Sequence, residues 1–268
     1  MGRLLLVGLG AVAVAGLLFY LTLPDVAPLA TSFPKTTAFM ERRRTELAGA
    51  GESTHLDWTP VPLSRISPNL RRAVVAAEDA RFYEHGGVDW EAVRGALEKD
   101  FKKRRLQRGA STITQQLAKN LFLSPARTPW RKLREWSIAR RLESTLPKQR
   151  ILELYLNVVE FGRHTYGAEA AARHYFAKSA ANLTPMEAAT LAAIIPSPRL
   201  YDPARHSSRV ARRARHILRW MRVVEKVEAV APSPASSPQT SPARPVSPMP
   251  ELTPLPPAEP SPVPGAAS

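Results

Sequence analysis

The middle of the chain follows the hydrophobic period of an α-helix. Apolar residues recur there every three or four positions, which is typical of helices that bury one face. No run of residues changes from apolar to polar at every step over a length that would predict a strand. A mainly α protein is therefore expected, with helices over residues 69–84, 89–101, 111–122, 129–145, 148–160, 167–176, 185–195 and 208–226.

The beginning of the chain differs because it lacks charge over a long run. Residues 4–23 contain no Asp, Glu, Lys or Arg, and a helix of this length is long enough to cross the hydrocarbon core of a bilayer. Arg3 precedes the run and Asp25 follows it, so residues 1–3 are expected in the cytoplasm and the remainder outside. A cleaved signal peptide is the alternative, although its apolar core is normally shorter, at about 7–15 residues. We favour one uncleaved N-terminal transmembrane helix.

Composition sets the remaining boundaries. Residues 24–65 carry several prolines and are expected to form a connecting arm, followed by one folded domain over residues 66–228. Residues 229–268 consist mostly of Pro, Ser and Ala and hold half of the 26 prolines of the chain. Such a segment has too few large apolar side chains to form a core, so a disordered Pro-rich C-terminal tail is expected.

The charge balance restricts the class of partner. Lys and Arg outnumber Asp and Glu, which gives a formal net charge of +15. This excess favours a polyanionic partner, which means nucleic acid, an anionic membrane surface or a phosphorylated substrate. The chain contains no Cys, which excludes disulfides, thiolate metal sites and Cys nucleophiles.

The first candidate for chemistry is the acid Glu78. On a continuous helix it would share one stripe with Val74 and Phe82, both apolar. Loss of water around a carboxylate disfavours its charged form and raises its pKa, which suits a group that transfers protons near neutral pH. In the alternative interpretation, Glu78 reaches the edge of the stripe or pairs with Arg81. A tight turn is expected directly after this helix, and Asp89 is expected to cap the next one.

A second candidate is the segment GASTITQQLAKN, residues 109–120. Wound as a helix, it buries an apolar half and presents neutral hydrogen-bonding groups around one ammonium. This composition predicts a surface that binds hydroxyls and anionic oxygens, whereas a partly exposed polar helix face is the simpler alternative. The residues on that half are Ser111, Thr112, Gln115, Gln116, Lys119 and Asn120.

Two further segments hold charged groups at helical spacing. Residues 127–136 combine several cations with the acid Glu135, and an Arg side chain can bind two phosphate oxygens at once. A solvated or membrane-facing basic helix would explain the same pattern. In residues 148–162, Glu153 and Asn157 share one helix face among core positions, so their role is interpreted as structural.

Together these segments resemble an ordered set of motifs of a known family. The motifs are Glu-Asp-x-x-Phe-x-x-His-x-Gly-x-Asp at 78–89, Gly-x-Ser-Thr-Ile-Thr-Gln-Gln at 109–116, Arg-Lys-x-x-Glu at 131–135 and Lys-x-x-Ile-Leu-Glu-x-Tyr-Leu-Asn at 148–157. The family is the peptidoglycan glycosyltransferases, glycosyltransferase family 51. Later stretches of the chain are similar to its monofunctional biosynthetic branch.

The resemblance implies a fold and a reaction. The fold is a mainly α, lysozyme-like domain with a long cleft and a small lobe that dips into the bilayer. The reaction polymerises lipid II: the 4-hydroxyl of the acceptor attacks C1 of a growing lipid-linked glycan strand and inverts it. A β-1,4 bond forms, and polyprenyl diphosphate leaves.

The resemblance also implies roles for individual residues. Glu78 is the general base, and Glu135 is a second acid that orients or tunes. The groups expected to balance charge on the diphosphate are Lys119, Arg127, Arg131 and Lys132. The groups expected to bind sugar hydroxyls and phosphate oxygens are Ser111, Thr112, Gln115, Gln116 and Asn120. Supporting roles fall to Asp79, Phe82 and His85 beside the base, and to Glu153 and Asn157 at the wall of the cleft.

The implied reaction requires no cofactor and no metal site is assigned, although a divalent cation such as Mg²⁺ or Mn²⁺ could assist. The implied location is the bacterial cytoplasmic (inner) membrane, with a single span and the catalytic domain on the periplasmic or outer face. Cell-wall synthesis or division proteins are candidate partners in addition to lipid II, and nucleic acid is not expected. Basic residues would hold the domain against anionic headgroups.

Two alternatives to this function stay open at the level of sequence. A lysozyme-like murein-cleaving hydrolase would act on polymer and ignore lipid II, and a non-enzymatic membrane scaffold would not need Glu78. The chain departs from the family pattern at Arg163, where an acid is expected after Phe161 and Gly162.

Overall fold

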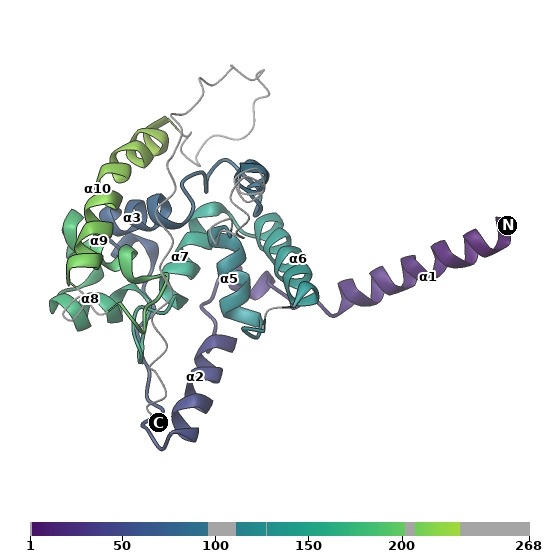
Figure 1. The fold of residues 1–268 in the computed structure, drawn as a ribbon, viewed down its shortest axis with the longest axis horizontal. Helices are drawn as coiled ribbons and strands as arrows, with labels where there is room; N and C mark the ends of the chain where they lie inside the picture. The colour runs from purple at the N-terminus through teal and green to yellow at the C-terminus, as the bar shows by residue number, and fades with distance from the viewer. Residues whose placement is uncertain (1, 96–110, 127, 202–206, 231–268) are drawn as a thin grey trace, which may run out of the picture.

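The computed structural model describes residues 2–95, 111–126, 128–201 and 207–230, and within these ranges the protein is mainly helical, as predicted (Figure 1). The α-helices are α1 (Gly2–Leu21), α2 (Ala38–Gly49), α3 (Pro68–Glu78), α5 (Ile113–Phe122), α6 (Pro129–Thr145), α7 (Lys148–Val158), α8 (Ala168–Phe176), α9 (Pro185–Ile194) and α10 (Ser207–Val230). Short 3₁₀ helices lie at η1 (Ala27–Ala30), η2 (Leu63–Arg65) and η3 (Ala180–Asn182).

Helix α1 extends away from the body of the protein (Figure 1). It covers most of the uncharged run, but within the described part of the chain no helix combines the length and the hydropathy of a membrane span. The chain leaving α1 is bound by α6. Arg134 donates to the carbonyl of Thr22 (3.0 Å), Arg141 donates to that of Leu23 (3.2 Å), and its guanidinium lies 4.8 Å from the Tyr20 ring centroid.

The segment expected to be a connecting arm is packed onto the domain. Leu29 belongs to the main hydrophobic core, and Met40 and Leu47 of α2 form a second buried cluster with Tyr166. Thr37 caps α2, because its side chain accepts a hydrogen bond from the Met40 amide (3.1 Å). Helix α2 packs against α5, so this segment helps to position the Gln-rich helix.

Two groups of helices make up most of the body. Helices α3, α9 and α10 pack against one another on the side opposite to α1, whereas α5 packs between α6 and α7 (Figure 1). Helix α9 begins with the capping box that the sequence predicts: the Thr184 hydroxyl accepts from the Glu187 amide, and the Glu187 carboxylate accepts from the Thr184 amide. The large side chains of Tyr155, Phe82 and Phe161 are fully buried in the main hydrophobic core.

The predicted helix 69–84 is too long, because α3 ends at Glu78. The next residue, Asp79, has φ −163° and ψ 74°, which is not helical. Its carboxylate accepts a hydrogen bond from the Ile113 amide (2.9 Å), a contact that a continuing helix would not allow. Phe82 therefore lies in the following turn and not on the stripe of α3, although it is fully buried.

The predicted start of the Gln-rich helix is also corrected. The helix begins at Ile113, and Thr112 is its N-cap, whose hydroxyl accepts from the Gln115 amide (3.2 Å). Thr112 and Ser111 precede the helix, so they do not lie on its polar face. A side chain that binds the first free amide groups is favoured over one more helical residue at this position.

The turn predicted at residues 85–87 is present as a bend, although it does not end α3, because residues 80–84 already form a turn. Gly87 has φ +90°, and a Cβ there would lie 3.1 Å from Cγ of Glu143, so both the backbone and the space favour glycine. Asp89 accepts from the Ala92 amide (2.8 Å) at the start of a helix whose described part is residues 90–95. The remainder of the predicted helix 89–101 lies outside the described residues.

The sequence does not predict the small sheet. Strands β1 (Asp57–Trp58) and β2 (Thr165–Tyr166) pair in parallel, with Asp57 opposite Thr165. Gly167 follows with φ +79°, and a Cβ there would lie 2.6 Å from the Asn157 carbonyl. A strand of two residues is too short to show a period.

The C-terminal end of the domain is helical. Helix α10 continues to Val230, two residues into the segment 229–268 that is expected to be a tail. The rest of that segment lies outside the described residues.

Candidate active site

Glu78 lies at the C-terminal end of α3, at a point where four helices meet. Only 11% of its side chain is exposed. Its Oε2 accepts a hydrogen bond from Nε2 of Gln116 on α5 (2.9 Å), whereas its Oε1 is buried without a hydrogen-bond partner among the described residues. Burial raises the pKa of the Glu78 carboxyl, against the opposing effects of Gln116, Arg213 and Lys119.

The predicted alternative of a Glu78–Arg81 pair is not observed. Arg81 instead binds Asp89, with Nε 3.1 Å from Oδ2, and it also contacts Glu91. Among the described residues, the cation that pairs with the carboxylate of Glu78 is Arg213 of α10, whose Nη2 lies 3.7 Å from Oε1. This separation permits electrostatic attraction but is too long for a hydrogen bond.

The amide of Gln116 is held from its other side. The hydroxyl of Tyr155 on α7 donates to Oε1 of Gln116 (2.9 Å), so three helices contribute to one chain of hydrogen bonds that ends at Glu78. Tyr155 is completely buried. Burial raises the pKa of its hydroxyl well above the usual range, and the nearby charges of Glu78 and Asp79 act in the same direction.

Asp79 joins α3 to α5 and to the turn that follows α3. Its Oδ2 accepts from the Ile113 amide, and its Oδ1 lies 2.8 Å from Nε2 of His85. The Gly87 amide donates to Nδ1 of His85 (3.2 Å), which leaves the proton on Nε2 for Asp79. Asp79 and His85 therefore fix the backbone beside Glu78.

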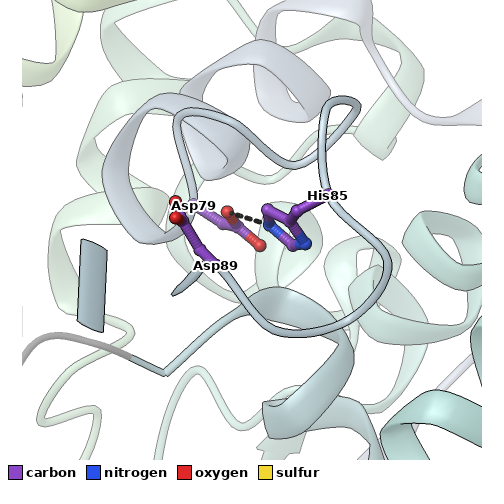
Figure 2. Close-up of side chains that lie close together, drawn as sticks. All are labelled: Asp79, His85 and Asp89. Carbon is purple, nitrogen blue, oxygen red and sulfur yellow. Dashed lines mark hydrogen bonds and ion pairs between the residues drawn. The ribbon is translucent and has the colours of Figure 1, made fainter. Parts of the chain in front are cut away.

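Asp79, His85 and Asp89 also have the donor atoms of a small cation site, all within 4.8 Å of one another (Figure 2). Each of these atoms already has a partner in the protein, and Asp89 binds the guanidinium of Arg81 and the Ala92 amide. A cation here would compete with a guanidinium and break the Asp79–His85 contact. The three residues fit a structural brace and do not fit a metal centre.

Glu135 on α6 lies in a different environment from Glu78. Only 4% of its side chain is exposed, and its two oxygens bind two cations. Oε2 contacts Arg131, and Oε1 lies 2.5 Å from Nζ of Lys132. The second predicted acid and two of the predicted cations are therefore brought together in one cluster.

Lys132 links this cluster to the start of α5. Its ammonium donates to Oε1 of Gln115 (3.0 Å) and lies 3.5 Å from the hydroxyl of Ser111. The side-chain Nε2 of Gln115 in turn donates to the Gly87 carbonyl (3.2 Å), which also accepts from the Thr112 hydroxyl (2.6 Å). Gln115 and Thr112 are thus bound within the protein, whereas Ser111 is exposed.

The ammonium of Lys119 interacts electrostatically with both Glu78 and Glu135. Burial lowers the pKa of its ammonium; the charges of Glu135 and Glu78 oppose this shift, and those of Arg131 and Lys132 add to it. Among the described residues the ammonium has no hydrogen-bond or ion-pair partner, and its contact is with the ring of Phe39 on α2, 5.5 Å from the centroid. A partly buried cation without an anion beside it favours binding of an anionic ligand.

The remaining predicted residues lie in other places. Asn120 is buried on α5. Arg127 falls outside the described residues. Asn157 holds the segment after β1 against α7: its Oδ1 accepts from the Val61 amide (2.8 Å) and its Nδ2 donates to the Val61 carbonyl (2.9 Å). Glu153 accepts from the Leu63 amide (2.7 Å), so both residues fasten one backbone segment.

Arg163, where the chain departs from the family pattern, points to the segment after α2. Its guanidinium pairs with Glu52, and its carbonyl accepts from Nε of Arg43 (2.9 Å). Within the described residues these contacts give Arg163 a role in holding α2.

Sequence reasoning missed three residues of the site: Tyr155, Arg213 and Phe39. Tyr155 belongs to the motif at 148–157 but reads as a core residue, because a buried hydroxyl has no signature in a single sequence. Arg213 is one of many arginines in α10. Phe39 lies in the segment that was expected to be a connecting arm.

Comparison with known proteins agrees with the motifs. The family model described as Transglycosylase matches residues 21–222. The biosynthetic peptidoglycan transglycosylase of Chromobacterium violaceum is 46% identical over 226 residues, which are 84% of this chain and 99% of the relative. A relative of the same name from Nitrosospira multiformis is 50% identical over 185 residues, which are 69% of this chain and 80% of the relative. Another from Thiobacillus denitrificans is 52% identical over 188 residues, which are 70% of this chain and 81% of the relative. The chain belongs to the transglycosylase family.

Proposed function

We propose that the protein is a peptidoglycan glycosyltransferase that polymerises lipid II into β-1,4-linked glycan strands for the bacterial cell wall. The family match and the names of the relatives support this class of reaction. The observation that carries the mechanism is the Glu78 carboxylate: it accepts from the Gln116 amide, its buried Oε1 has no hydrogen-bond partner among the described residues, and its pKa is raised. These are the properties of a general base.

In the proposed step, Glu78 accepts the proton of the 4-hydroxyl of the incoming lipid II. The oxygen of that hydroxyl forms a bond to C1 of the donor strand, and the bond from C1 to the diphosphate oxygen breaks. The configuration at C1 inverts, and the proton ends on Oε1 of Glu78. The absence of a hydrogen-bond donor on Oε1 among the described residues supports this atom as the proton acceptor.

The leaving polyprenyl diphosphate carries negative charge that must be balanced. Lys119 is suited to this role because it is partly buried without an anionic partner among the described residues. Arg131 and Lys132 are held beside it by Glu135, and Arg127 completes the proposed set by resemblance. Fixed cations that meet developing charge stabilise a transition state without reorganisation of solvent.

Sugar and phosphate oxygens of the substrate are assigned to the polar groups around α5. Ser111 is exposed and lies near Lys132, which supports direct contact with substrate. Thr112, Gln115 and Gln116 have partners within the protein, so their first effect is to shape the site and to hold Lys132 and Glu78.

We infer attachment to the bacterial cytoplasmic membrane through residues 4–23, with the catalytic domain on the periplasmic or outer face. The uncharged run and the basic residue before it support this topology. A lipid-linked substrate also requires an enzyme at the bilayer surface. The reaction as proposed needs no cofactor, a divalent cation could assist the diphosphate, and cell-wall synthesis or division proteins are candidate partners.

The proposal is tested by polymerisation of lipid II by the full chain in vesicles. The wild-type protein is expected to produce glycan polymer and to release polyprenyl diphosphate, and Glu78→Gln is expected to lose at least about a thousandfold in rate, within the range for removal of a general base. Binding of lipid II to Glu78→Gln should be retained. Polymer produced by Glu78→Gln at the wild-type rate would contradict the assignment of the base.

The same assay separates the two alternatives. A murein-cleaving hydrolase would release reducing or anhydro ends from preformed polymer and would leave lipid II unchanged. A scaffold would bind lipid II without consuming it, and Glu78→Gln would behave as the wild type. Either outcome would contradict the proposed function.

A further inference from the structure

The hydrogen-bonded chain Tyr155–Gln116–Glu78 connects three helices at the base of the site. Tyr155 of α7 donates to Oε1 of Gln116 (2.9 Å), and Nε2 of Gln116 on α5 donates to Oε2 of Glu78 (2.9 Å) at the end of α3. Tyr155 is completely buried and does not contact solvent.

The two ends of the Gln116 amide are chemically different, so its orientation matters. With the NH₂ group toward Glu78, the amide donates to a carboxylate; with the oxygen toward Glu78, two acceptors would face each other. The Tyr155 hydroxyl favours the first orientation, because only in that orientation does the amide oxygen accept the hydroxyl proton while the NH₂ group donates to the carboxylate. Without the Tyr155 hydroxyl, only the carboxylate of Glu78 would orient the amide, and the amide would be held less firmly.

The hydroxyl of Tyr155 is a donor at every pH at which the enzyme is expected to work. Burial and the nearby charges of Glu78 and Asp79 keep its proton bound. The donor at the far end of the chain therefore does not change while Glu78 gains and loses its proton.

We propose that Tyr155 is a positioning residue for the base: by fixing the amide of Gln116, it holds the carboxylate of Glu78 with Oε1 directed away from α5 and available to the acceptor hydroxyl. Tyr155 acts through Gln116 and does not touch the substrate. The inference rests on the proposed role of Glu78 as general base.

Several other groups face Glu78 and contribute to its titration. Arg213 of α10 and Lys119 of α5 lower the pKa of the carboxyl, as Gln116 does, and the neighbouring Asp79 raises it. Loss of the Gln116 donor would remove one of the lowering effects. The acid limb of the pH–rate profile should then move to higher pH, while Arg213 and Lys119 stay in place.

The test is a comparison of the wild-type chain with Tyr155→Phe in the lipid II polymerisation assay. The ring is retained and the hydroxyl is lost, so the core should stay filled. We expect kcat to fall about tenfold with KM little changed, and the acid limb to move to higher pH, because the base is displaced but still present.

A matched control is Tyr175→Phe. The Tyr175 hydroxyl donates to the Phe161 carbonyl (2.9 Å), and within the described residues it does not take part in the chain that ends at Glu78. This variant should keep the wild-type kcat and pH profile. A fall of kcat by the same factor in Tyr175→Phe would show that loss of a tyrosine hydroxyl elsewhere against the core is enough, and it would overturn the inference.

A double variant tests whether Tyr155 acts through Gln116. In a Gln116→Met background the amide is absent, so Tyr155→Phe should have no further effect on kcat. Tenfold losses that multiply in the double variant would overturn the inference and would indicate a general packing role. If Glu78→Gln is inactive but Tyr155→Phe matches the wild type in kcat and pH profile, the positioning role of Tyr155 is wrong and the assignment of Glu78 as the base stands. If Glu78→Gln is active, the assignment of the base itself fails.

Discussion

Glu78 and Glu135 are both removed from solvent, with 11% and 4% of their side chains exposed, but their partners differ completely. Glu78 has one amide donor and a guanidinium at 3.7 Å, and its Oε1 has no hydrogen-bond partner in the described part of the chain. Glu135 binds a cation with each of its oxygens. One acid is buried with little compensation, and the other is neutralised by ion pairs.

This difference shows that burial alone does not assign a role to an acid. A buried carboxylate with few partners resists ionisation and accepts a proton readily, whereas a carboxylate in two ion pairs is a fixed negative charge that orients its cations. Lys119 interacts electrostatically with both acids, because the charges of Glu135 and Glu78 both raise the pKa of its ammonium. We therefore assign proton transfer to Glu78 and organisation of the diphosphate site to Glu135.

Among the variants that keep Glu78, the largest loss of activity should come from Lys119→Gln, which removes the positive charge that interacts with both acids. We expect polymerisation to slow about 10²–10³-fold, the range for loss of one electrostatic group in a transition state. The acid limb should also move to higher pH, because Lys119 lowers the pKa of Glu78. Lys178→Gln, which alters a surface pair with Glu187, is the control and should keep the wild-type rate.

Glu135→Gln should have a smaller effect, about tenfold in kcat, because the cations remain but lose their shared anchor. Stability should fall as well, since Arg131 and Lys132 are left without an anion. Glu169→Gln is a matched control: Glu169 is a buried acid paired with Arg173, so stability should fall while kcat is retained. Equal losses of kcat in both variants would contradict the role given to Glu135.

A third prediction concerns stability and pH. The pKa of Glu78 is raised in the folded protein, so its stabilising contribution is fully present below the pKa of the unfolded chain and is lost as pH rises through the folded pKa. At pH values above the folded pKa of Glu78, the Glu78→Gln variant should therefore have a Tm higher than the wild type by a few degrees. In acid the substitution should have little effect on Tm. Thermal unfolding followed by circular dichroism at several pH values measures this.

The control for that measurement has the opposite sign. The pKa of Glu187 is lowered, first by its hydrogen bond with Lys178, so its contribution is present above the pKa of the unfolded chain and is lost as pH falls. Glu187→Gln should lower Tm at neutral pH and converge with the wild type in acid. The same direction of change in both variants would contradict the contrast between the two environments.

The smallest effect on activity is expected from Glu153→Gln. Glu153 accepts from the Leu63 amide and pairs with Arg150. We expect a rate within about twofold of the wild type and a loss of about 1–2 kcal/mol in the free energy of unfolding. Urea denaturation provides the second value.

The helical framework and the burial of Glu78 could be predicted from sequence, because helical period and caps such as that at Thr184 are local signals. The end of α3 at Glu78 could not, since it depends on Asp79 reaching the Ile113 amide, a contact between distant segments. Tyr155 and Arg213 were missed for the same reason: their partner Gln116 or Glu78 is defined only by the packing of different helices.

The most direct test of the central claim is the pH dependence of kcat/KM for lipid II polymerisation by the wild-type chain, measured together with Glu78→Asp. A base at Glu78 predicts an acid limb with a pKa above 4.5, the ordinary value for this side chain, and a shift of that limb when the carboxylate is moved by one methylene. An acid limb at or below 4.5, or one that is identical in the two proteins, would contradict proton transfer by Glu78.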